Sequence, residues 1–481
     1  MKYKPTIGLE IHIELNTKSK MFCSCKNDSQ EKIPNKNICP ICTGQPGTLP
    51  VPNKEAIKKV IKTGLSLNCK INQFSYFERK NYFYPDLPKG YQISQYKTPL
   101  CYDGYLEIED ENKKLKKISI NRIHLEEDTG KLLHTIGDYT LVDLNRAGIP
   151  LMELVTEPEI HSAVEAANFA KELQLILRYL DVSNADMEKG QMRVEVNISL
   201  AKEGSEKLGT KVEIKNLNSF LAVQKSIIYE IERQTEILEK GGEIIQETRG
   251  WSDEKQITFS QREKEYAKDY RYFPEPDILP IYITNKDLEE LKKEIPELPQ
   301  QKRIKYQEIF QLPKEDTEVL IKNIKLNQFF ENFILFSKEK NKDFIKLASN
   351  YLTNEILSYI TNNENFWQNS KLSPENFYDL MFLIYKKEIT SKIAKIIIPK
   401  IIQTGKNPKD ILIEENLAQI NKEDVLEKII NEVISENQKA VEDFKSGKEN
   451  ALQYLIGKIM EKSKGRANPI ILRETLKKLL R

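Results

Sequence analysis

The residues with the clearest chemical potential alternate with aliphatic residues close to the N-terminus. Glu10, His12 and Glu14 alternate with the apolar residues of segment 7–15, which is the pattern of a β-strand with one apolar and one polar face. Residues two apart on a strand lie on the same face, about 6.6 Å apart. A single metal ion can bridge that gap, so Glu10 and His12 are candidates to bind one together.

Other predicted strands carry charged residues on one face as well. Similar alternation occurs in segments 193–198 and 211–215, and the predicted strand 118–125 runs directly into Glu126-Glu127-Asp128. Gathered carboxylates raise one another's pKa unless a cation lies between them, and oxygen ligands are typical of Mg²⁺ sites. Carboxylates for Mg²⁺ beside bases for phosphate would make an ATP site on a sheet. The simpler alternative is that these faces are only solvated.

Two common nucleotide-binding sites are disfavoured. The chain contains neither a Walker Gly-x₄-Gly-Lys-Ser/Thr motif nor a Gly-x-Gly-x-x-Gly motif. Without these glycine-rich turns, a P-loop or a Rossmann phosphate site has no sequence support.

Four of the six cysteines form two close pairs, which are Cys23, Cys25, Cys39 and Cys42. Two pairs of thiolates are typical of tetrahedral zinc, although the first pair has one intervening residue instead of two. We therefore predict a structural zinc held by an insertion at 23–42, with free thiols as the alternative. Cys69 and Cys101 are expected to be ordinary buried residues.

The elements that position these residues fall into a mixed N-terminal part and a helical remainder. A chain of 481 residues exceeds what one hydrophobic core usually serves. Gly and Pro separate short alternating runs as far as about Pro280, whereas beyond Thr284 apolar residues recur at helical spacing. We expect an α+β fold, with a mixed domain at 1–293, a helical domain at 294–407 and a small helical tail at 408–481.

Two helix starts are well marked. Ser162 with Glu165 predicts a capping box at the start of a core-packing helix. Ser373-Pro374 predicts an N-cap followed by proline in the first turn of another.

The charge of the chain is balanced overall but uneven along its length. A net charge of +2 gives no global attraction for polyanions, so nucleic-acid binding would need a local patch. Segment 452–481 has eight basic and two acidic residues, a net charge of +6. This segment is a candidate phosphate-binding surface, although lysines also decorate the solvent face of ordinary amphipathic helices.

Neither a membrane segment nor an export signal is predicted. No apolar run approaches the roughly 18 residues that a membrane helix needs, and the N-terminus has no signal-peptide apolar region. We therefore expect a cytoplasmic protein without membrane contact.

Several long motifs closely resemble one family, the B subunits of the tRNA-dependent Asp/Glu amidotransferases. They extend from residue 7 to 469 and are Ile7-Gly8-Leu9-Glu10-Ile11-His12, Arg79-Lys80-Asn81-Tyr82-Phe83-Tyr84-Pro85-Asp86, Gly90-Tyr91-Gln92-Ile93-Ser94-Gln95, His124-Leu125-Glu126-Glu127-Asp128, Lys215-Asn216-Leu217-Asn218-Ser219-Phe220, Asp269-Tyr270-Arg271-Tyr272-Phe273-Pro274-Glu275-Pro276-Asp277 and Ser463-Lys464-Gly465-Arg466-Ala467-Asn468-Pro469.

The resemblance implies both a fold and a reaction. The fold would be a glutamine-synthetase-like cradle with an antiparallel sheet, then a helical domain and a YqeY-like tail that grips tRNA. The protein would phosphorylate the side-chain carboxylate of Glu-tRNA(Gln) or Asp-tRNA(Asn) with ATP. Ammonia channelled from an amidase partner, the glutaminase of the complex, would then displace the phosphate. A third, small subunit would complete a heterotrimer.

The resemblance also implies site residues. Mg²⁺ would be held by Glu10, His12 and the pair Glu126/Glu127, and these four would be the catalytic residues. On charge and location alone, the expected phosphate contacts of ATP are Arg79, Lys80, Arg193 and Lys215. In the tail, the expected tRNA contacts are Lys458, Lys462, Lys464 and Arg466. Zinc at the cysteines rests on their spacing.

Two other classes of function remain open at this stage. One is an ATP-dependent ligase that makes a small-molecule amide without tRNA, for which a basic tail has no purpose. The other is a tRNA-binding scaffold without catalytic activity, which would turn over no ATP.

Overall fold

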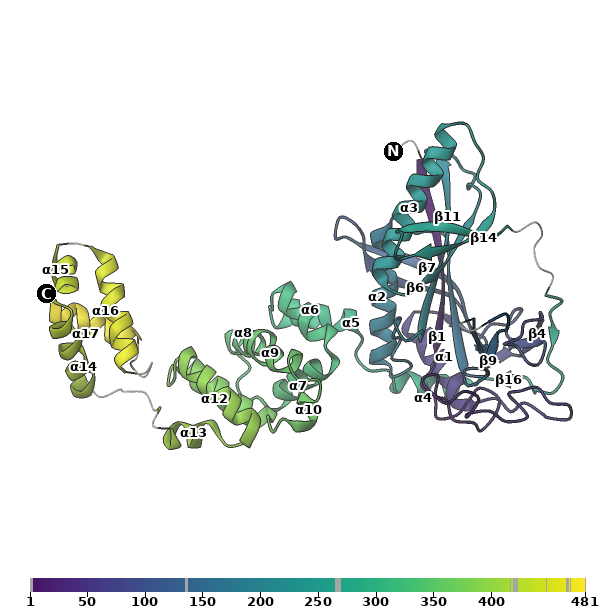
Figure 1. Ribbon diagram of the computed structural model, residues 1–481. Coiled ribbons are helices and arrows are strands. Elements are labelled where there is room, and N and C mark those ends of the chain that lie inside the picture. Colours follow the sequence, from purple (N-terminus) through teal and green to yellow (C-terminus); the bar gives the residue numbers. More distant parts are fainter. Residues whose placement is uncertain are drawn as a thin grey trace. The chain divides into compact units, whose positions relative to one another are not determined.

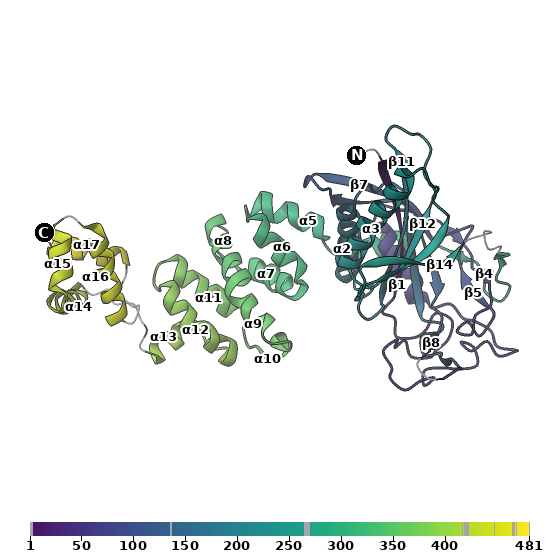
Figure 2. The ribbon, with the colours of Figure 1, turned by 45° about the horizontal axis from the view of Figure 1, so that its top comes forward.

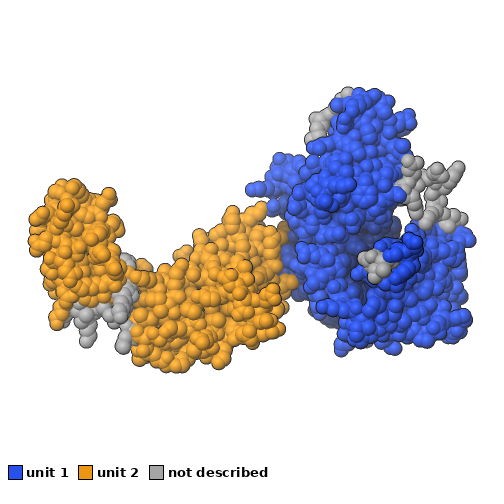
Figure 3. All heavy atoms as spheres, in the orientation of Figure 1, with its two compact units in different colours: residues 1–299 blue, residues 300–481 orange. Residues whose placement is uncertain are grey.

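The computed structural model describes residues 3–134, 137–263, 270–415, 417, 423–446, 448–463, 467 and 469–480. The chain divides into two compact units, residues 1–299 and residues 300–481 (Figure 3, blue and orange). An α+β fold is confirmed, because a large sheet with helices makes up the first unit and helices make up the second. The finer division at 407/408 stays a prediction.

The first unit is built on a nine-stranded sheet with the order β14-β13-β12-β11-β1-β10-β7-β6-β2. In chain order its strands are β1 (Tyr3–Glu14), β2 (Lys70–Ile71), β6 (Cys101–Glu109), β7 (Leu115–Glu127), β10 (Pro150–Thr156), β11 (Met192–Lys202), β12 (Val212–Leu217), β13 (Glu247–Ser252) and β14 (Ile257–Glu263).

The sheet is mixed, whereas the expected one was antiparallel. Neighbouring strands pair antiparallel except β12 and β13, which pair in parallel with Glu213 opposite Thr248. Helix α3 (Phe220–Glu239) lies between these two strands in the chain. A helical crossover returns the chain to the starting edge, so the next strand runs in the same direction.

The described part of the first unit also contains three small sheets, which are β15–β4–β5, β16–β3 and β8–β9. Their bounds are β3 (Phe74–Ser75), β4 (Glu78–Asn81), β5 (Tyr91–Ser94), β8 (Lys131–Leu133), β9 (Leu141–Asp143), β15 (Phe273–Pro274) and β16 (Ile281–Tyr282). The remaining helices of this unit are α1 (Lys54–Ser66), α2 (Ala163–Tyr179) and α4 (Asn285–Lys293).

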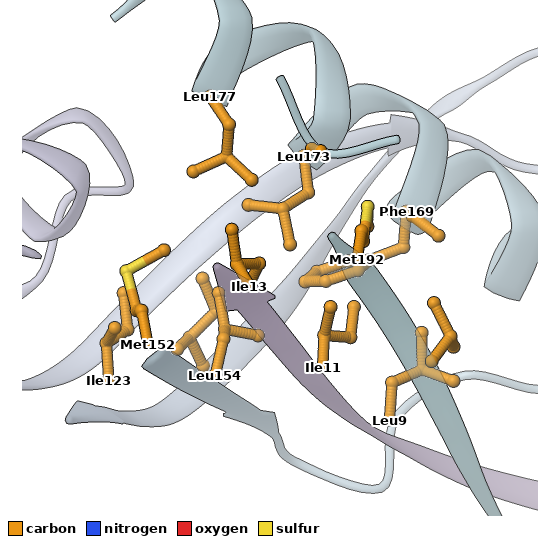
Figure 4. Packing of buried hydrophobic residues seen from close by; sticks show 14 of the residues in the cluster. Leu9, Ile11, Ile13, Ile123, Met152, Leu154, Phe169, Leu173, Leu177 and Met192 are labelled. Carbon is orange, nitrogen blue, oxygen red and sulfur yellow. The ribbon is translucent and has the colours of Figure 1, made fainter. Parts of the chain in front are cut away.

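The core lies between the apolar face of the sheet and the helices α2 and α3, which run along that face in both ribbon views (Figures 1 and 2). Leu9, Ile11 and Ile13 of β1 are at most 1% exposed. Figure 4 shows these residues beside Phe169 and Leu173 of α2. Because side chains alternate along a strand, Glu10, His12 and Glu14 point to the opposite face of the sheet.

The start of α2 confirms half of the predicted capping box. Ser162 is the N-cap, and its side chain accepts a hydrogen bond from Glu165 N at 3.2 Å. The reciprocal bond is not made in the described structure: the Glu165 carboxylate accepts from His161 N at 2.9 Å and from Lys116 Nζ at 2.8 Å. The nearby Lys116 ammonium and the His161 amide satisfy this carboxylate in place of the N-cap amide.

The described part of the second unit is helical. It contains α5 (Pro299–Ile304), the π-helical turns Lys305–Ile309 and Tyr351–Ile356, α6 (Lys314–Lys322), α7 (Ile324–Phe336), α8 (Lys342–Asn350), α9 (Leu357–Thr361), α10 (Phe366–Asn369), α11 (Pro374–Tyr385), α12 (Ser391–Thr404), α13 (Pro408–Glu414), α14 (Glu423–Glu436), α15 (Gln438–Lys445), α16 (Glu449–Lys462) and α17 (Pro469–Leu480). Helix α11 starts as predicted, with Ser373 as N-cap and Pro374 at the first position.

The last four helices have a core of their own. Leu426, Ile430 and Val433 of α14 pack with Leu455 and Ile459 of α16, and all five are buried. These stripes are the ones that helical periodicity predicts. None of the described helices is both long and apolar enough to cross a bilayer.

A histidine–carboxylate cluster on the sheet

Three potential metal ligands lie in one row across three neighbouring strands of the sheet. His12 of β1 pairs with Glu153 of β10, and Glu153 pairs with His124 of β7. Directly opposed residues on adjacent strands have their side chains on the same face, about 4.5–5.5 Å apart. The strand register therefore positions an imidazole, a carboxylate and a second imidazole side by side, on the face opposite α2.

Two further carboxylates complete the cluster. His12 Nε2 lies 3.4 Å from Glu153 Oε2, 3.8 Å from Glu10 Oε1 and 3.8 Å from Glu126 Oε1. His124 Nε2 lies 3.5 Å from Glu153 Oε2 and 3.7 Å from Glu126 Oε2. Two groups of three residues, Glu10–His12–Glu153 and His124–Glu126–Glu153, each place their ligand atoms within 4.8 Å of one another, close enough to hold a metal ion.

The cluster opens into a cavity of about 880 Å³, and the residues that line it are Glu10, His12, Lys80, Tyr82, Gln92, Gln95, Tyr96, Arg122, His124, Glu126, Asp128, Thr129, Leu151, Glu153, Arg193, Glu195, Glu213, Lys215, Tyr270 and Tyr272. They come from five strands of the large sheet and from the segments around β4, β5 and β15. A cavity of this size, with converging charged groups, is large enough for a nucleotide.

Burial and mutual repulsion shift the titration of these groups. Burial, followed by the charge of Glu153, raises the pKa of Glu10 to about 7. Burial opposes the charged form of His12, but the hydrogen bond and charge of Glu153 prevail and raise its pKa to about 9. Burial likewise opposes the charged form of Glu153, yet the two histidines hold its pKa below the usual range. Protons thus occupy positions that a divalent cation would take, as is usual for a metal-binding cluster.

Glu126 and Glu127 have different surroundings. The Glu126 carboxylate faces both histidines and accepts a hydrogen bond from Ser94 Oγ at 3.2 Å. Glu127 accepts from Ile93 N at 3.0 Å, forms an ion pair with Lys89, and lines a separate cavity together with Cys42. The placement favours Glu126 as the cation-binding member of the pair.

Three of the four expected phosphate contacts line the cavity, namely Lys80, Arg193 and Lys215. Arg193 is paired with Asp128 at 3.1 Å, and Lys215 with Glu195 at 2.6 Å. Lys80 has no carboxylate within 4.0 Å among the described residues; its ammonium lies 5.0 Å from the centre of the Tyr270 ring. Burial opposes the charged form of Lys80, but the charges of Glu126, Glu153 and other groups of the cavity together raise its pKa, so it remains a cation.

Arg79 points away from the cavity. Its guanidinium binds Glu275 at 2.7 and 2.8 Å and lies 4.3 Å from the centre of the Tyr91 ring. Arg79 and Lys80 are consecutive in β4, so only one of them can face the cavity. Arg79 therefore fixes β4 to the 275–277 segment and is not positioned to contact phosphate in the cavity.

The four clustered cysteines lie close together, although the described segment 23–42 that carries them contains no helix or named strand. The sulfur atoms of Cys23, Cys25, Cys39 and Cys42 lie within 4.8 Å of one another. Cys42 Sγ accepts a hydrogen bond from Cys39 N at 3.2 Å. The set can bind a metal ion, and four converging sulfurs are typical of structural zinc. Cys69 and Cys101 are buried elsewhere, as expected.

A buried lysine accompanies the cysteine cluster. Lys20 is fully buried, and its Nζ lies 3.8 Å from Cys42 Sγ and 3.3 Å from Leu144 O. A hydrogen bond from Cys23, aided by the Lys20 charge, lowers the pKa of Cys42 to about 5. Cys42 therefore favours the thiolate form, which is the form that binds metal. The shared hydrogen bond with Cys42 raises the pKa of Cys23, and burial raises that of Cys25 to about 11.

The tail residues expected to contact tRNA are placed only in part. Lys458 and Lys462 lie on α16, where Lys458 pairs with Glu461 at 3.0 Å and Lys462 with Glu436 at 2.6 Å. Lys464 and Arg466 lie outside the described residues. Ion pairs at exposed positions contribute little and exchange readily, so these pairs do not prevent phosphate contacts.

Sequence reasoning missed Glu153 altogether and named His124 only as part of an acidic run. The signal for Glu153 was a single carboxylate in the otherwise apolar segment 150–155. A buried strand tolerates such a residue only where it has partners. Its partners lie on strands that are distant in the chain, so spacing alone could not identify them.

The sheet and its cavity define a class of protein: an α+β protein that presents a histidine–carboxylate cluster beside lysine and arginine residues. Comparison with known sequences specifies the family. The GatB/GatE catalytic domain family matches residues 5–289, and the GatB domain family matches residues 328–480. The chain belongs to the family of aspartyl/glutamyl-tRNA(Asn/Gln) amidotransferase B subunits.

Individual relatives match along the full length. The aspartyl/glutamyl-tRNA(Asn/Gln) amidotransferase B subunit of Persephonella marina is 47% identical over 481 residues, which cover 100% of both chains. That of Thermotoga maritima is 47% identical over 485 residues, covering 100% of this chain and 99% of the relative. That of Thermoanaerobacter pseudethanolicus is 47% identical, with 100% of both chains covered.

Proposed function

We propose that this chain is the phosphorylating and amidating subunit of a heterotrimeric amidotransferase. It uses ATP to phosphorylate the side-chain carboxylate of Glu-tRNA(Gln), Asp-tRNA(Asn) or both. Ammonia from the glutaminase, an amidase subunit of the same complex, then displaces the phosphate, and the products are Gln-tRNA(Gln) or Asn-tRNA(Asn). The full-length match to relatives bearing the amidotransferase name supports this assignment.

The observation that carries the proposal is the row His12–Glu153–His124 with Glu10 and Glu126 beside it. Imidazole nitrogen and carboxylate oxygen are suitable donors for Mg²⁺ or Mn²⁺, so the residues present fit a divalent cation. Glu10, His12 and Glu126 would hold it. A bound Mg²⁺ would neutralise phosphate charge during transfer.

The residues around the cluster have separate tasks in this reaction. A carboxylate is a poor electrophile, and phosphorylation gives it a leaving group. Lys80, a cation without a carboxylate partner in the described structure, neutralises charge on the transferred phosphoryl group. Arg193 and Lys215, each held by a carboxylate, orient phosphate oxygens from fixed positions. Ammonia attacks the acyl phosphate, and phosphate leaves.

The remaining parts of the chain serve binding. We assign residues 1–293 to a glutamine-synthetase-like cradle, 294–407 to a helical domain and 408–481 to a YqeY-like tail that binds tRNA. The third, small subunit would join this chain to the amidase, and the cysteine cluster would hold a structural zinc.

The test is ATP turnover by the assembled heterotrimer. We expect ADP release that depends on mischarged tRNA, and its loss in Glu10→Ala while glutamine hydrolysis stays measurable. A scaffold would release no ADP with any substrate. A small-molecule ligase would release ADP without aminoacyl-tRNA. Near-normal amidation by Glu10→Ala would remove Glu10 from the chemistry.

A further inference from the structure

Arg122 of β7 lines the cavity and has no hydrogen-bonded carboxylate in the described structure. Its Nη2 lies 3.6 Å from Glu153 Oε1, which is longer than a hydrogen bond. Nη1 donates to Asn121 Oδ1 at 3.3 Å, and Nε is buried without a hydrogen-bond partner among the described residues. Buried N–H groups usually have partners, so this guanidinium has capacity to bind a further anion.

Other arginines of this chain show what the Nε–Nη2 edge of a guanidinium binds. Arg79 donates from Nε and Nη2 to the two carboxylate oxygens of Glu275 at 2.7 and 2.8 Å. Arg233 donates in the same way to Glu230, at 2.9 Å for each bond. Two parallel hydrogen bonds of this kind match the planar shape of a carboxylate. The same edge of Arg122 lacks such a pair, and its side chain is 31% exposed, so it can turn toward a carboxylate in the cavity.

The strand order separates Arg122 from Arg193 and Lys215, the two strand residues assigned to phosphate. Those two lie on β11 and β12, whereas Arg122 lies on β7, with β1 and β10 between them. Neighbouring strands are about 4.8 Å apart, so β11 and β7 are about 14 Å apart. A phosphate on one side and a second anion on the other would meet over β1 and β10, which carry His12 and Glu153.

The residue beside Arg122 in the sheet is apolar. Arg122 pairs with Val155 of β10, and Val155 pairs with Glu10 of β1, so the three side chains share one face. Val155 is half-buried and offers an aliphatic surface next to the guanidinium. A cation beside an apolar surface suits an aspartyl or glutamyl side chain, which has a carboxylate on a short methylene stem.

We propose that Arg122 binds the side-chain carboxylate of the aminoacyl substrate and directs one of its oxygens to the γ-phosphate of ATP. This inference rests on the proposed function and extends it, because it names the residue that holds the second anion of the reaction. A carboxylate and a triphosphate repel each other as they approach. A guanidinium on the carboxylate and the Lys80 ammonium on the phosphoryl group reduce this repulsion.

Arg122 acts in both steps of the reaction. In the first, one carboxylate oxygen forms a bond to the γ-phosphorus, and the bond from that phosphorus to the bridging oxygen breaks, with its electron pair leaving on ADP. In the second, the nitrogen of ammonia adds to the carbonyl carbon, and negative charge develops on the oxygen that Arg122 holds. A positioned donor stabilises such an oxyanion. The bond from carbon to the phosphate oxygen then breaks, and phosphate leaves with the electron pair and takes the surplus proton from nitrogen.

The experiment measures binding by the full heterotrimer with Mg²⁺ and the β,γ-methylene analogue of ATP, which does not transfer its terminal phosphoryl group. The probes are Glu-tRNA(Gln) against Gln-tRNA(Gln), and Asp-tRNA(Asn) against Asn-tRNA(Asn). In at least one pair, the unaltered complex should bind the carboxylate form more tightly by ~10-fold, the scale of a hydrogen bond to a charged group. Arg122→Gln should lose this preference and bind the ATP analogue as tightly as before.

Two further variants separate the carboxylate contact from a folding defect. Arg122→Lys keeps the charge but not the paired bonds, and should recover only part of the preference. Arg122→Ala should regain part of its amidation rate when guanidinium ion is added, which a misfolded site would not do. Lys117→Gln is the matched control: it removes an exposed cation of the same strand, 3.7 Å from Glu107, and should leave the preference and amidation unchanged.

The outcomes distinguish this inference from the proposed function. No preference in the unaltered complex, or an unchanged preference in Arg122→Gln, would overturn the inference. Weaker binding of the ATP analogue by Arg122→Gln, with the preference retained, would also overturn it, because Arg122 would then hold phosphate. The binding measurement needs no turnover: a complex that shows the preference through Arg122 but releases no ADP would overturn the proposed function alone.

Discussion

Glu126 and Glu127 are neighbours in β7, yet their carboxylates serve different cavities. Glu126 faces His12 and His124 at 3.8 and 3.7 Å, whereas Glu127 accepts from Ile93 N and pairs with Lys89. The alternation of side chains along a strand requires this separation. One carboxylate is placed for cation chemistry, and the other fixes β7 to β5 and to Lys89 just before it.

Substitution of the two glutamates separates activity from stability. Glu126→Gln removes a charged oxygen from the cluster, and we expect amidation to fall by ~100-fold or more with little change in melting temperature, on the scale at which altered metal environments act. Glu127→Gln leaves the Lys89 ammonium, whose side chain is 10% exposed, without its charged partner, and breaking a buried pair in this way typically costs about 3–5 kcal/mol. Parallel amidation assays and thermal melts compare them; equal loss of activity would contradict the division of roles.

The stability of the protein should depend on pH through Glu14. Burial, followed by the charge of Asp128, raises the pKa of this carboxyl group to about 7, from 4.5 in the unfolded chain. Between these two values the folded state keeps a proton that the unfolded state releases, so stability falls as pH rises from 4.5 to 7. The full shift corresponds to about 3 kcal/mol.

Glu14→Gln removes this titration. The variant should match the unaltered protein at pH 4 and be more stable than it at pH 8, when melting temperatures are recorded across this range. Glu111→Gln, at an exposed acid between β6 and β7, is the control and should leave the curve in place. If the melting temperature of Glu14→Gln changed between pH 4 and pH 8 by as much as that of the unaltered protein, the buried, protonated carboxyl group would be contradicted.

The sequence predicted the strands that carry the site better than it predicted which residues form the site. Alternation places Glu10, His12 and Arg193 on one face, because the period of a strand is local. The row from His12 to His124 depends on which strand lies beside β1, and β10 is more than 130 residues away in the chain. Arg79 was named from its charge and location, and Glu127 from motif similarity, and neither criterion distinguishes the two faces of a strand.

The cysteine cluster should bind one zinc whose affinity depends on Lys20. Four thiolates around one Zn²⁺ leave a net charge of −2, and the buried Lys20 ammonium, 3.8 Å from Cys42 Sγ, offsets part of it. Lys20→Met keeps the length of the side chain and removes the charge, so we expect zinc to be held ~10–100-fold less tightly. Metal analysis gives the stoichiometry, and competition with a chromophoric chelator gives the affinity.

Lys26→Met is the matched control for Lys20. Lys26 lies in the same insertion but is exposed and paired with Asp28 at 2.8 Å, so its removal should leave zinc affinity unchanged. Native protein that contains no zinc and has all four thiols freely titratable would contradict the site itself. Equal affinities in Lys20→Met and the unaltered protein would contradict only the role of the lysine.

The last prediction concerns the basic tail. Helices α14 to α17 share their own core, whereas α13 packs against α11 and α12. Deleting residues 418–481 therefore removes the basic segment and leaves α13 with its partners. We expect weaker tRNA binding and a flatter salt dependence, because each phosphate that the protein neutralises contributes roughly 0.7–0.9 to the slope. Glutamine hydrolysis should persist, since the ammonia source is the amidase and not this chain.

Charge variants of α16 separate an electrostatic role of the tail from a structural one. Lys458→Gln combined with Lys462→Gln removes two cations of α16. The slope of tRNA affinity against salt should then become shallower by at most the contribution of about two phosphates, since each contributes roughly 0.7–0.9. Glu461→Gln frees Lys458 from its ion pair and should leave binding equal or slightly tighter. Filter binding of tRNA from 50 to 200 mM salt measures both. Removal of a segment that contacts phosphates must reduce the number of counterions released on binding. If the truncated complex bound tRNA with unchanged affinity and salt slope, the tail would therefore act in packing or assembly.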